Sequence, residues 1–109
     1  MKQYEIWWAD LPEPVGRRPV LLMAREAAYR YLSWVLVVEI TTNARDIPVE
    51  LALGRAEGLP RASVASFDNL HVVPKSALTA RVGTLKIGRV AEVKRAMGYA
   101  LDWPELKEI

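Results

Sequence analysis

The side chains best suited to binding a phosphate are two adjacent arginines, Arg17 and Arg18, which follow a proline-rich segment and precede an apolar run. Neighbouring side chains of an extended chain point to opposite faces, so only one of these arginines can face a given pocket. A guanidinium fixed at the start of a buried strand can bind a phosphate through two parallel hydrogen bonds. The alternative is a surface ion pair with Asp10 or Glu13.

Hydroxyl and imidazole groups accompany two later apolar runs. Thr41 and Thr42 end the most β-branched run of the chain, where a hydroxyl can donate to a phosphoryl oxygen, although threonine is common at strand ends. His71 is flanked by Leu70 and Val72, which share the opposite face of a strand. This pattern favours an exposed strand residue over a catalytic base.

The residue types that are missing exclude several kinds of metal site and catalytic mechanism. The 109 residues include no cysteine and one histidine. This excludes disulfides, cysteine-bound zinc, iron–sulfur clusters, thiol nucleophiles and a two-histidine ribonuclease mechanism within one chain. We therefore expect neither a metal nor a cofactor. The formal charge of +2, from 15 Lys and Arg against 13 Asp and Glu, permits a nucleic-acid partner without requiring one.

Basic side chains are concentrated in one segment. The single acid Glu92 is outnumbered there by six basic residues: Lys75, Arg81, Lys86, Arg89, Lys94 and Arg95. Such a cluster is either a solvated helix face or a surface that attracts phosphates. Both interpretations stay open.

The chain is expected to be a single cytoplasmic domain over residues 1–109. Acidic residues interrupt the N-terminal segment where a signal peptide would carry its apolar core. No apolar run approaches the roughly 20 residues that a membrane span needs. We expect no membrane partner.

The elements that must position these side chains are short strands followed by one helix, which is typical of a mainly β fold with α: a small curled sheet or barrel with a helix packed on it. Adjacent Trp7 and Trp8 must place one ring on each face of the first strand, one in the core and the other over an interface or a flat partner. The pair Asp68-Asn69 is interpreted as a turn between two strands. The expected strands are residues 5–11, 20–24, 34–41, 48–53, 63–67, 70–73 and 82–87, with helical turns at 25–31 and 74–78.

The apolar spacing changes near the C-terminal end. From residue 89 onward apolar residues recur at spacings of 3, 4 and 4, which predicts an amphipathic helix that ends before Pro104. Its apolar residues are Val90, Val93, Met97 and Leu101.

The order of five segments resembles the MazF/PemK family of toxin endoribonucleases from bacterial type II toxin–antitoxin systems. The segments are EIWWADL, GRRPVLL, VVEITTNARDIPVEL, GLPRASVASFDNLHVVPKSAL and RVGTL, which together cover most of residues 5–101. The resemblance implies an SH3-like small barrel of the CcdB/PemK toxin type with a C-terminal helix. It also implies a homodimer that cuts single-stranded RNA without a metal and leaves a 2′,3′-cyclic phosphate and a 5′-hydroxyl.

The resemblance also implies which residues act. Arg18 and Thr41 match the family's catalytic arginine and threonine, the first neutralising charge on the phosphorane and the second holding a phosphate oxygen. Asp68 matches an acidic residue that contributes in the PemK branch, whereas Ser66 stands where that branch has an arginine. The implied RNA-binding residues are Arg17, Thr42, Asn43, Arg45, Ser66, Asn69 and Lys75.

The loop before Arg17 departs from the family pattern, because it is short and lacks the usual acidic residue unless Glu13 replaces it. We hypothesise that the short loop opens the site to structured RNA, which cleavage of a hairpin and an unstructured oligonucleotide with the same site would test. The expected partners are an antitoxin with an acidic tail and, through that complex, operator DNA. The alternatives are a non-catalytic, CcdB-like gyrase-binding toxin on the same fold and an SH3-like adaptor.

Overall fold

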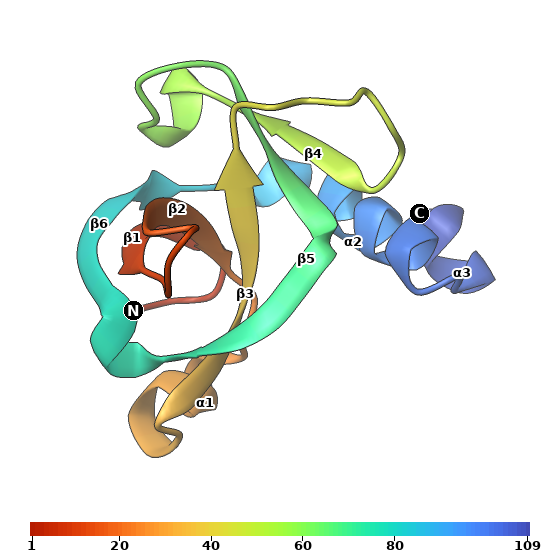
Figure 1. Cartoon of the computed structure of the whole chain (residues 1–109). Coiled ribbons are helices and arrows are strands. Elements are labelled where there is room, and N and C mark those ends of the chain that lie inside the picture. Colours follow the sequence, from red (N-terminus) through yellow and green to blue (C-terminus); the bar gives the residue numbers. More distant parts are fainter.

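Six antiparallel strands form one strongly curled sheet in the computed structural model, which describes residues 1–109 (Figure 1). The strand order across the sheet is β4-β5-β3-β2-β1-β6, so β3 lies near its centre and β4 and β6 are its edges. The strands are β1 Glu5–Asp10, β2 Arg17–Leu22, β3 Trp34–Thr41, β4 Glu50–Leu53, β5 Ser63–Pro74 and β6 Leu78–Thr84.

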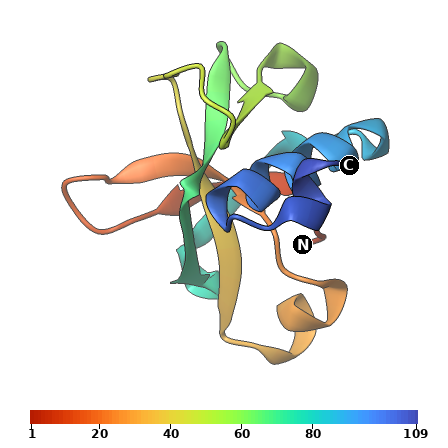
Figure 2. The same cartoon turned by 90° about the vertical axis from the view of Figure 1, so that its right-hand side faces the viewer.

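The helices lie outside the curled sheet. Figure 1 shows α2 and α3 together beside β4 and β5, whereas α1 follows β2 at the other end of the molecule. In Figure 2 the hairpin that joins β1 to β2 projects away from the body. None of the helices has the length and apolar character that crossing a bilayer requires. The helical segments are α1 Glu26–Tyr31, α2 Val90–Ala100 and α3 Pro104–Lys107, with 3₁₀ turns η1 Arg55–Glu57, η2 Lys75–Ala77 and η3 Ile87–Arg89.

The sheet buries apolar side chains on both faces, and β3 supplies both cores. Val35 and Val37 face one core, which α1 closes with Ala28. Val38 and Ile40 face the other core, which α2 closes with side chains that include Val93 and Ala96. Continuous β-branched sequence is typical of a strand buried on both faces. The expectation of a mainly β fold with a C-terminal helix is confirmed.

The predicted turn at Asp68-Asn69 is wrong, because residues 63–74 form the single strand β5. Val38 of β3 pairs with Leu70, whereas Ile40 pairs with Ala65, so residues 66–69 lie opposite Glu39 alone. Extra residues bend a strand without reversing it. Phe67 is buried inside this bend, and its amide donates to the carbonyl of Val49 at 2.9 Å.

Several strand boundaries also differ from expectation. β1 ends at Asp10 rather than at residue 11, and β4 begins at Glu50 rather than at residue 48. The last strand spans Leu78–Thr84 rather than 82–87, because pairing with β1 extends it toward η2. β2 begins at Arg17 and includes Pro19. Proline fits there because β2 pairs with β3 only from Val20 to Leu22, so no ladder bond to β3 needs an amide at Pro19.

The C-terminal helix forms as predicted, but its apolar stripe is shifted. Val93 and Ala96 are buried against the sheet. Leu101 lies beyond the end of α2 and is about half exposed.

Candidate active site

Strands β2 and β3 change from apolar to polar at the same level of one sheet face. Val20 of β2 and Val37 of β3 belong to the same buried cluster. Arg18 lies two residues before Val20, and Glu39 lies two residues after Val37. Glu39 is the direct register partner of Val20, and alternate residues of a strand share a face. Arg18, Glu39 and Thr41 therefore emerge together where the core ends.

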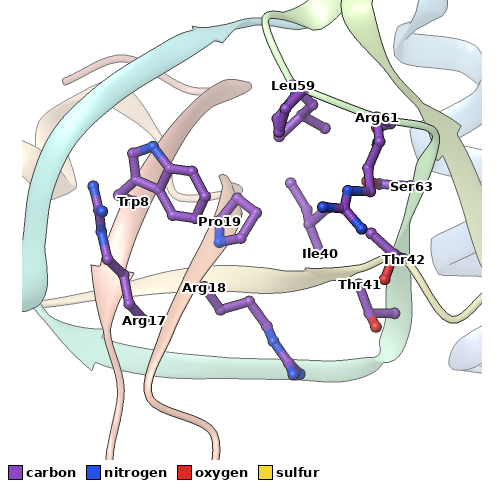
Figure 3. A pocket seen from close by; sticks show the side chains of 11 residues that line it. Trp8, Arg17, Arg18, Pro19, Ile40, Thr41, Thr42, Leu59, Arg61 and Ser63 are labelled. Atoms are coloured by element: carbon purple, nitrogen blue, oxygen red, sulfur yellow. Dashed lines mark hydrogen bonds between the residues drawn. The ribbon is translucent and has the colours of Figure 1, made fainter.

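Arg18 is held by one ion pair and keeps the rest of its guanidinium free. Its Nη1 donates to Oε1 of Glu39 at 3.2 Å, and its side chain is 34% exposed. The partner is thus Glu39 rather than the Asp10 or Glu13 expected of a surface ion pair. In Figure 3 the guanidinium points toward Thr41. An arginine side chain has five N–H donors, so four remain for an anion in the pocket.

Arg17 leaves the opposite face of β2, as alternation predicts, but its side chain lines the same pocket as Arg18, so the expectation that only one of the two can face a given pocket is wrong. Its guanidinium carbon lies 4.5 Å from the ring centre of Trp8, within cation–π distance. Trp7, on the opposite face, packs against the core and donates its indole N–H to Glu5 at 3.1 Å. The prediction that the two tryptophans divide between core and surface agrees with this arrangement.

Thr41 presents a hydroxyl whose proton is available. Its Oγ1 accepts a hydrogen bond from the backbone amide of Asn43 at 3.2 Å. A hydroxyl carries one donor besides its acceptor lone pairs, so the O–H of Thr41 can still donate into the site.

Glu50 shapes the loop that follows β3. Its carboxylate accepts hydrogen bonds from the amides of Arg45, at 2.9 and 3.1 Å, and Asp46, at 2.9 Å. Asp46 has a positive φ of 57°, a conformation that asparagine and aspartate tolerate better than most residues. The loop is therefore held against β4, with Asn43 and Arg45 beside Thr41.

Two pockets meet at Arg18 and Thr41, which line both. The first, here called the arginine pocket, has a volume of about 240 Å³ and contains three arginines and no acid among its lining residues (Figure 3). The second, here called the polar pocket, has a volume of about 420 Å³. The arginine pocket is lined by Trp8, Arg17, Arg18, Pro19, Ile40, Thr41, Thr42, Leu59, Pro60, Arg61 and Ser63, and the polar pocket by Arg18, Thr41, Asn43, Arg45, Ile47, Glu50, Ser66, Asp68 and Asn69.

Most of the residues singled out in the sequence line one of these pockets. Arg17 and Thr42 line the arginine pocket, and the polar pocket includes Asp68 with Asn43, Arg45, Ser66 and Asn69. The bend in β5 is what presents residues 66–69 to Arg18. Glu13 is exposed in the β1–β2 hairpin and lines neither pocket, so it does not replace the family's acidic loop residue there.

Lys75 is not brought to the site. Its Nζ donates to the carbonyl of Tyr29 at 2.8 Å, and its amide donates to the carbonyl of Ser33 at the start of β3. Thr41 ends the same strand, roughly 25 Å away along extended chain. The structure therefore gives no support to an RNA contact by Lys75.

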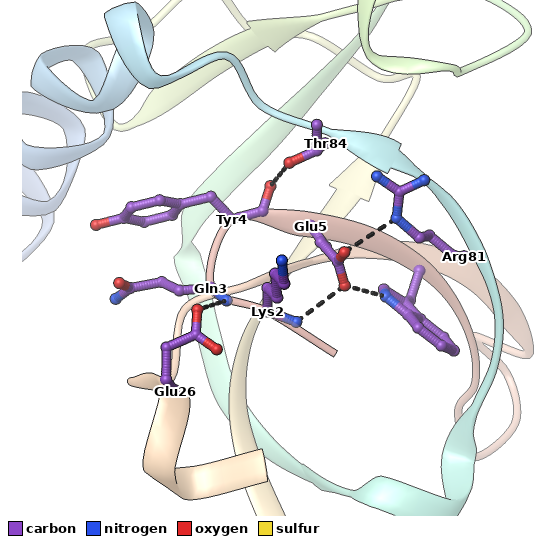
Figure 4. Close-up of polar contacts among 8 residues, drawn as sticks. Lys2, Gln3, Tyr4, Glu5, Glu26, Arg81 and Thr84 are labelled. Carbon is purple, nitrogen blue, oxygen red and sulfur yellow. Dashed lines mark hydrogen bonds and ion pairs between the residues drawn. The ribbon is translucent and has the colours of Figure 1, made fainter.

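The basic segment 75–95 does not form one phosphate-attracting face. Arg81 Nε donates to Oε2 of Glu5 at 3.0 Å, and Arg95 donates to the carbonyl of Ile109 at 2.8 Å (Figure 4 shows the contacts of Glu5). Burial alone would raise the pKa of Glu5, but hydrogen bonds from Trp7, from the Lys2 amide and from Arg81 outweigh it and lower the pKa. These contacts tie strands together rather than offering charge to a ligand.

Three charged residues at or next to the site were not singled out in the sequence: Glu50, described above, Arg61 and Glu39. Arg61 lines the arginine pocket from the segment between η1 and β5, and Figure 3 shows it on the Thr42 side. Glu39 contacts Arg18, and its Oε2 lies 2.8 Å from Nε2 of His71. An acid inside an otherwise apolar, β-branched strand was the available signal for Glu39. Arg61 lies in a loop whose position depends on the closure of the whole fold, and no local pattern marks it.

The site offers anion-binding donors rather than metal ligands. No group of three or more His, Asp or Glu side chains is placed to hold a metal ion. What the arrangement can do is bind a phosphate between a guanidinium and a hydroxyl, with extended chain on either side in the two pockets.

Comparisons with known proteins identify the family. Residues 2–101 match the model of a family described as PemK-like, MazF-like toxin of type II toxin–antitoxin systems. The chain is 33% identical over 99 residues to the probable endoribonuclease MazF5 of Mycobacterium tuberculosis, covering 90% of each protein.

Solved structures extend the likeness to the fold. The structure of Mycobacterium tuberculosis toxin MazF-mt6 superposes with a TM-score of 0.84 at 33% identity, over 90% of this chain and 96% of that one. An endoribonuclease from a mycobacterial species, solved in complex with its cognate antitoxin, superposes with a TM-score of 0.83 at 26% identity, over 95% and 97%.

Proposed function

The chain belongs to the family of PemK-like, MazF-like toxins of type II toxin–antitoxin systems and is an endoribonuclease toxin, and we propose that it cuts RNA where Arg18 and Thr41 meet. The observation that carries this proposal is that Arg18 and Thr41 line both pockets and so stand at their junction. The relative described above is named a probable endoribonuclease, which favours RNA cleavage over a gyrase-binding toxin on the same fold.

In the proposed reaction the RNA supplies its own nucleophile. The 2′-oxygen attacks the adjacent phosphorus, a bond from O2′ to phosphorus forms, and the bond from phosphorus to O5′ breaks. The 2′-hydroxyl proton leaves to solvent and O5′ takes up a proton, which leaves a 2′,3′-cyclic phosphate and a 5′-hydroxyl. The free donors of Arg18 bind the phosphorane oxygens as their charge grows, and the O–H of Thr41 holds one of them.

The nucleotides on either side of the cut would occupy the two pockets. The arginine pocket, with Trp8, Arg17 and Arg61, offers positive charge and an aromatic ring. This combination suits the backbone and bases of a single strand. The polar pocket offers the amides of Asn43 and Asn69 and the carboxylate of Asp68, groups that can hydrogen-bond to base edges.

An antitoxin would compete with RNA for the same charge. We expect its acidic segment to cover the arginine pocket, because no acid of the toxin lines that pocket. Operator DNA would be bound through the antitoxin in this complex. The location that suits an RNA-cleaving toxin of this kind is the cytoplasm, and the chain would act as the single toxin domain 1–109.

We also propose that two copies pair. The groove lined by Leu11, Trp34 and Val72 is a suitable face, since Trp34 and Val72 are about half exposed in it. It lies next to the site, because His71 lines the groove and is 2.8 Å from Glu39, the partner of Arg18. Sedimentation of the Trp34→Glu chain should show a monomer, and an unchanged dimer would exclude this face.

The test of the function is cleavage of RNA by the purified chain in the presence of a chelator. We expect cuts at a short, reproducible sequence, with 5′ ends that polynucleotide kinase can label without prior phosphatase and 3′ ends that resist ligation until the cyclic phosphate is opened. A purified acidic antitoxin peptide should inhibit the reaction. A correctly folded chain that cuts no RNA would contradict the proposal, and inhibition of gyrase by that chain would favour the alternative.

A further inference from the structure

Glu39 is a largely buried acid that lies beside the site without lining either pocket. Its side chain is 16% exposed, and it faces the same side of β3 as Thr41. Each carboxylate oxygen has a separate neighbour: Oε1 accepts from Nη1 of Arg18 at 3.2 Å, and Oε2 lies 2.8 Å from Nε2 of His71. The three residues come from β2, β3 and β5, so the carboxylate joins all three strands behind the proposed phosphate position.

His71 lies close to Glu39 without forming a hydrogen bond to it. Its Nε2 is 2.8 Å from Oε2 of Glu39, yet this buried nitrogen has no hydrogen-bond partner. The ring therefore limits where the carboxylate can move by contact. The hydrogen bond from Arg18 to Oε1 is what holds the guanidinium against the carboxylate.

We propose that Glu39 and His71 are positioning residues for the cleavage reaction, acting through Arg18: Glu39 orients the guanidinium, and the ring of His71 restrains the carboxylate from behind. This inference rests on the proposed function. Glu39 and His71 touch no reacting atom. They set how strongly the free donors of Arg18 act on the charge that develops on the phosphorane.

The test compares Glu39→Gln with a matched control elsewhere in the sheet, Glu5→Gln. Glu5 is also largely buried, at 13% exposed, and pairs with an arginine, Arg81, at 3.0 Å. Single-turnover cleavage is measured on an RNA that contains the mapped site, and affinity is measured on the same RNA with a 2′-deoxynucleotide at the cut, which lacks the nucleophile.

Glu39→Gln should lower the cleavage rate by about ten- to a hundredfold. The affinity for the deoxy-substituted RNA should change less than about threefold, because Arg18 keeps its charge. Glu5→Gln should leave both quantities unchanged. A wild-type rate for the Glu39 variant, or an equal loss in the Glu5 variant, would overturn the positioning role.

His71→Gln is a second variant, which keeps the proposal testable if Glu39→Gln fails to fold. The exchange removes the ring that lies 2.8 Å from Oε2 of Glu39 and so loosens the carboxylate. The single-turnover cleavage rate should fall several-fold, whereas the affinity for the deoxy-substituted RNA should change less than about threefold. A wild-type cleavage rate for His71→Gln would overturn the role of His71.

Arg18→Ala distinguishes a failure of this inference from a failure of the proposed function on which it rests. If Arg18→Ala cuts RNA as fast as the unmodified chain, the proposed site is wrong. If Arg18→Ala is inactive while Glu39→Gln and His71→Gln are unaffected, the site stands and only the positioning role fails.

Discussion

Arg18 and Arg89 each lie beside a largely buried carboxylate, yet their surroundings differ. The guanidinium of Arg89 is surrounded by protein acceptors: Nε and Nη2 donate to Glu92 at 2.8 and 3.0 Å, Nη2 also donates to the carbonyl of Ala52 at 2.7 Å, and Nη1 lies 3.5 Å from Glu57. Arg18 makes one contact, to Glu39, and its other donors face the pockets.

The difference separates an arginine that builds the fold from one that is free to bind. Arg89 joins η1, β4 and α2, and Glu57, its partner in η1, is only 5% exposed. The hydrogen bond to Glu92 raises the pKa of Arg89 more than burial lowers it. The donors of Arg18 that lack protein acceptors are the ones that an anion can use. Counting acceptors around a guanidinium distinguishes the two roles, which the residue type alone does not.

Replacing Arg18 should have the largest effect on catalysis. Arg18→Ala removes the main positive charge at the proposed phosphate position, and we expect the single-turnover cleavage rate to fall by about 10²–10³-fold. Stability should change by about 1 kcal/mol or less, because the pair is partly exposed and Glu39 keeps His71 as a neighbour. The measurements are cleavage of a mapped RNA site and urea unfolding of the same preparation.

The control for lost charge is Lys94→Ala, which removes one positive charge from the exposed side of α2. It should cut RNA at the wild-type rate. Equal losses in Arg18→Ala and Lys94→Ala would mean that net charge, not the position of Arg18, governs the reaction.

Replacing Arg89 should affect stability and spare the chemistry. Arg89→Ala leaves Glu57 with only the Gly54 amide as a partner, at 2.7 Å, and we expect the free energy of unfolding to fall by about 2–3 kcal/mol. The rate per folded molecule should match the wild type. The matched control is Arg95→Ala, whose side chain donates only to the Ile109 carbonyl, and its stability should change by less than about 1 kcal/mol. An inactive but fully stable Arg89→Ala chain would erase the distinction between the two arginines.

The parts of the fold that the sequence predicts are those that local pattern determines. β3 has the predicted bounds, Trp34–Thr41, because a long β-branched run has no other favourable conformation. The continuity of β5 was missed because Asp68-Asn69 favours a turn locally, whereas the contacts that keep the chain extended, from Phe67 to Val49 and from Ser66 to Glu50, join residues that are distant in the sequence.

The residues of the candidate site also differ in whether local sequence pattern or tertiary contacts determine their position. Arg18 and Thr41 stand out because each borders an apolar run, and their expected roles come from the resemblance to the MazF/PemK pattern. Arg61 and the contact between Glu39 and His71 were missed, because both depend on how separate strands and loops close around the pocket. Lys75 was chosen for its charge, and the structure uses that charge on the carbonyl of Tyr29.

Arg61 and Arg55 allow a second comparison of two arginines, in which only Arg61 lines a pocket and the expected effect is on RNA affinity. Arg61 lines the arginine pocket with an exposed side chain, so Arg61→Ala should weaken RNA binding several-fold and reduce the slope of log affinity against log salt by about one. The cleavage rate at saturating RNA should stay near the wild-type value. Arg55→Ala, in η1, removes an exposed guanidinium that lines neither pocket, and its salt slope should be unchanged. Identical slopes for the two variants would place the RNA elsewhere.

The smallest expected effect concerns Glu92, the partly exposed carboxylate that pairs with Arg89. The hydrogen bond from Arg89 lowers the pKa of Glu92 below its ordinary value of 4.5 despite partial burial. A depressed pKa in the folded state contributes stability that is present above the ordinary value and is lost as the pH falls through the folded-state pKa. Because the side chain is 42% exposed, this contribution is about 0.5 kcal/mol. Urea unfolding of Glu92→Gln should therefore show slightly lower stability than the wild type at neutral pH, and the two should converge in acid. A constant difference between wild type and Glu92→Gln at all pH values would assign the effect to packing rather than to the ion pair.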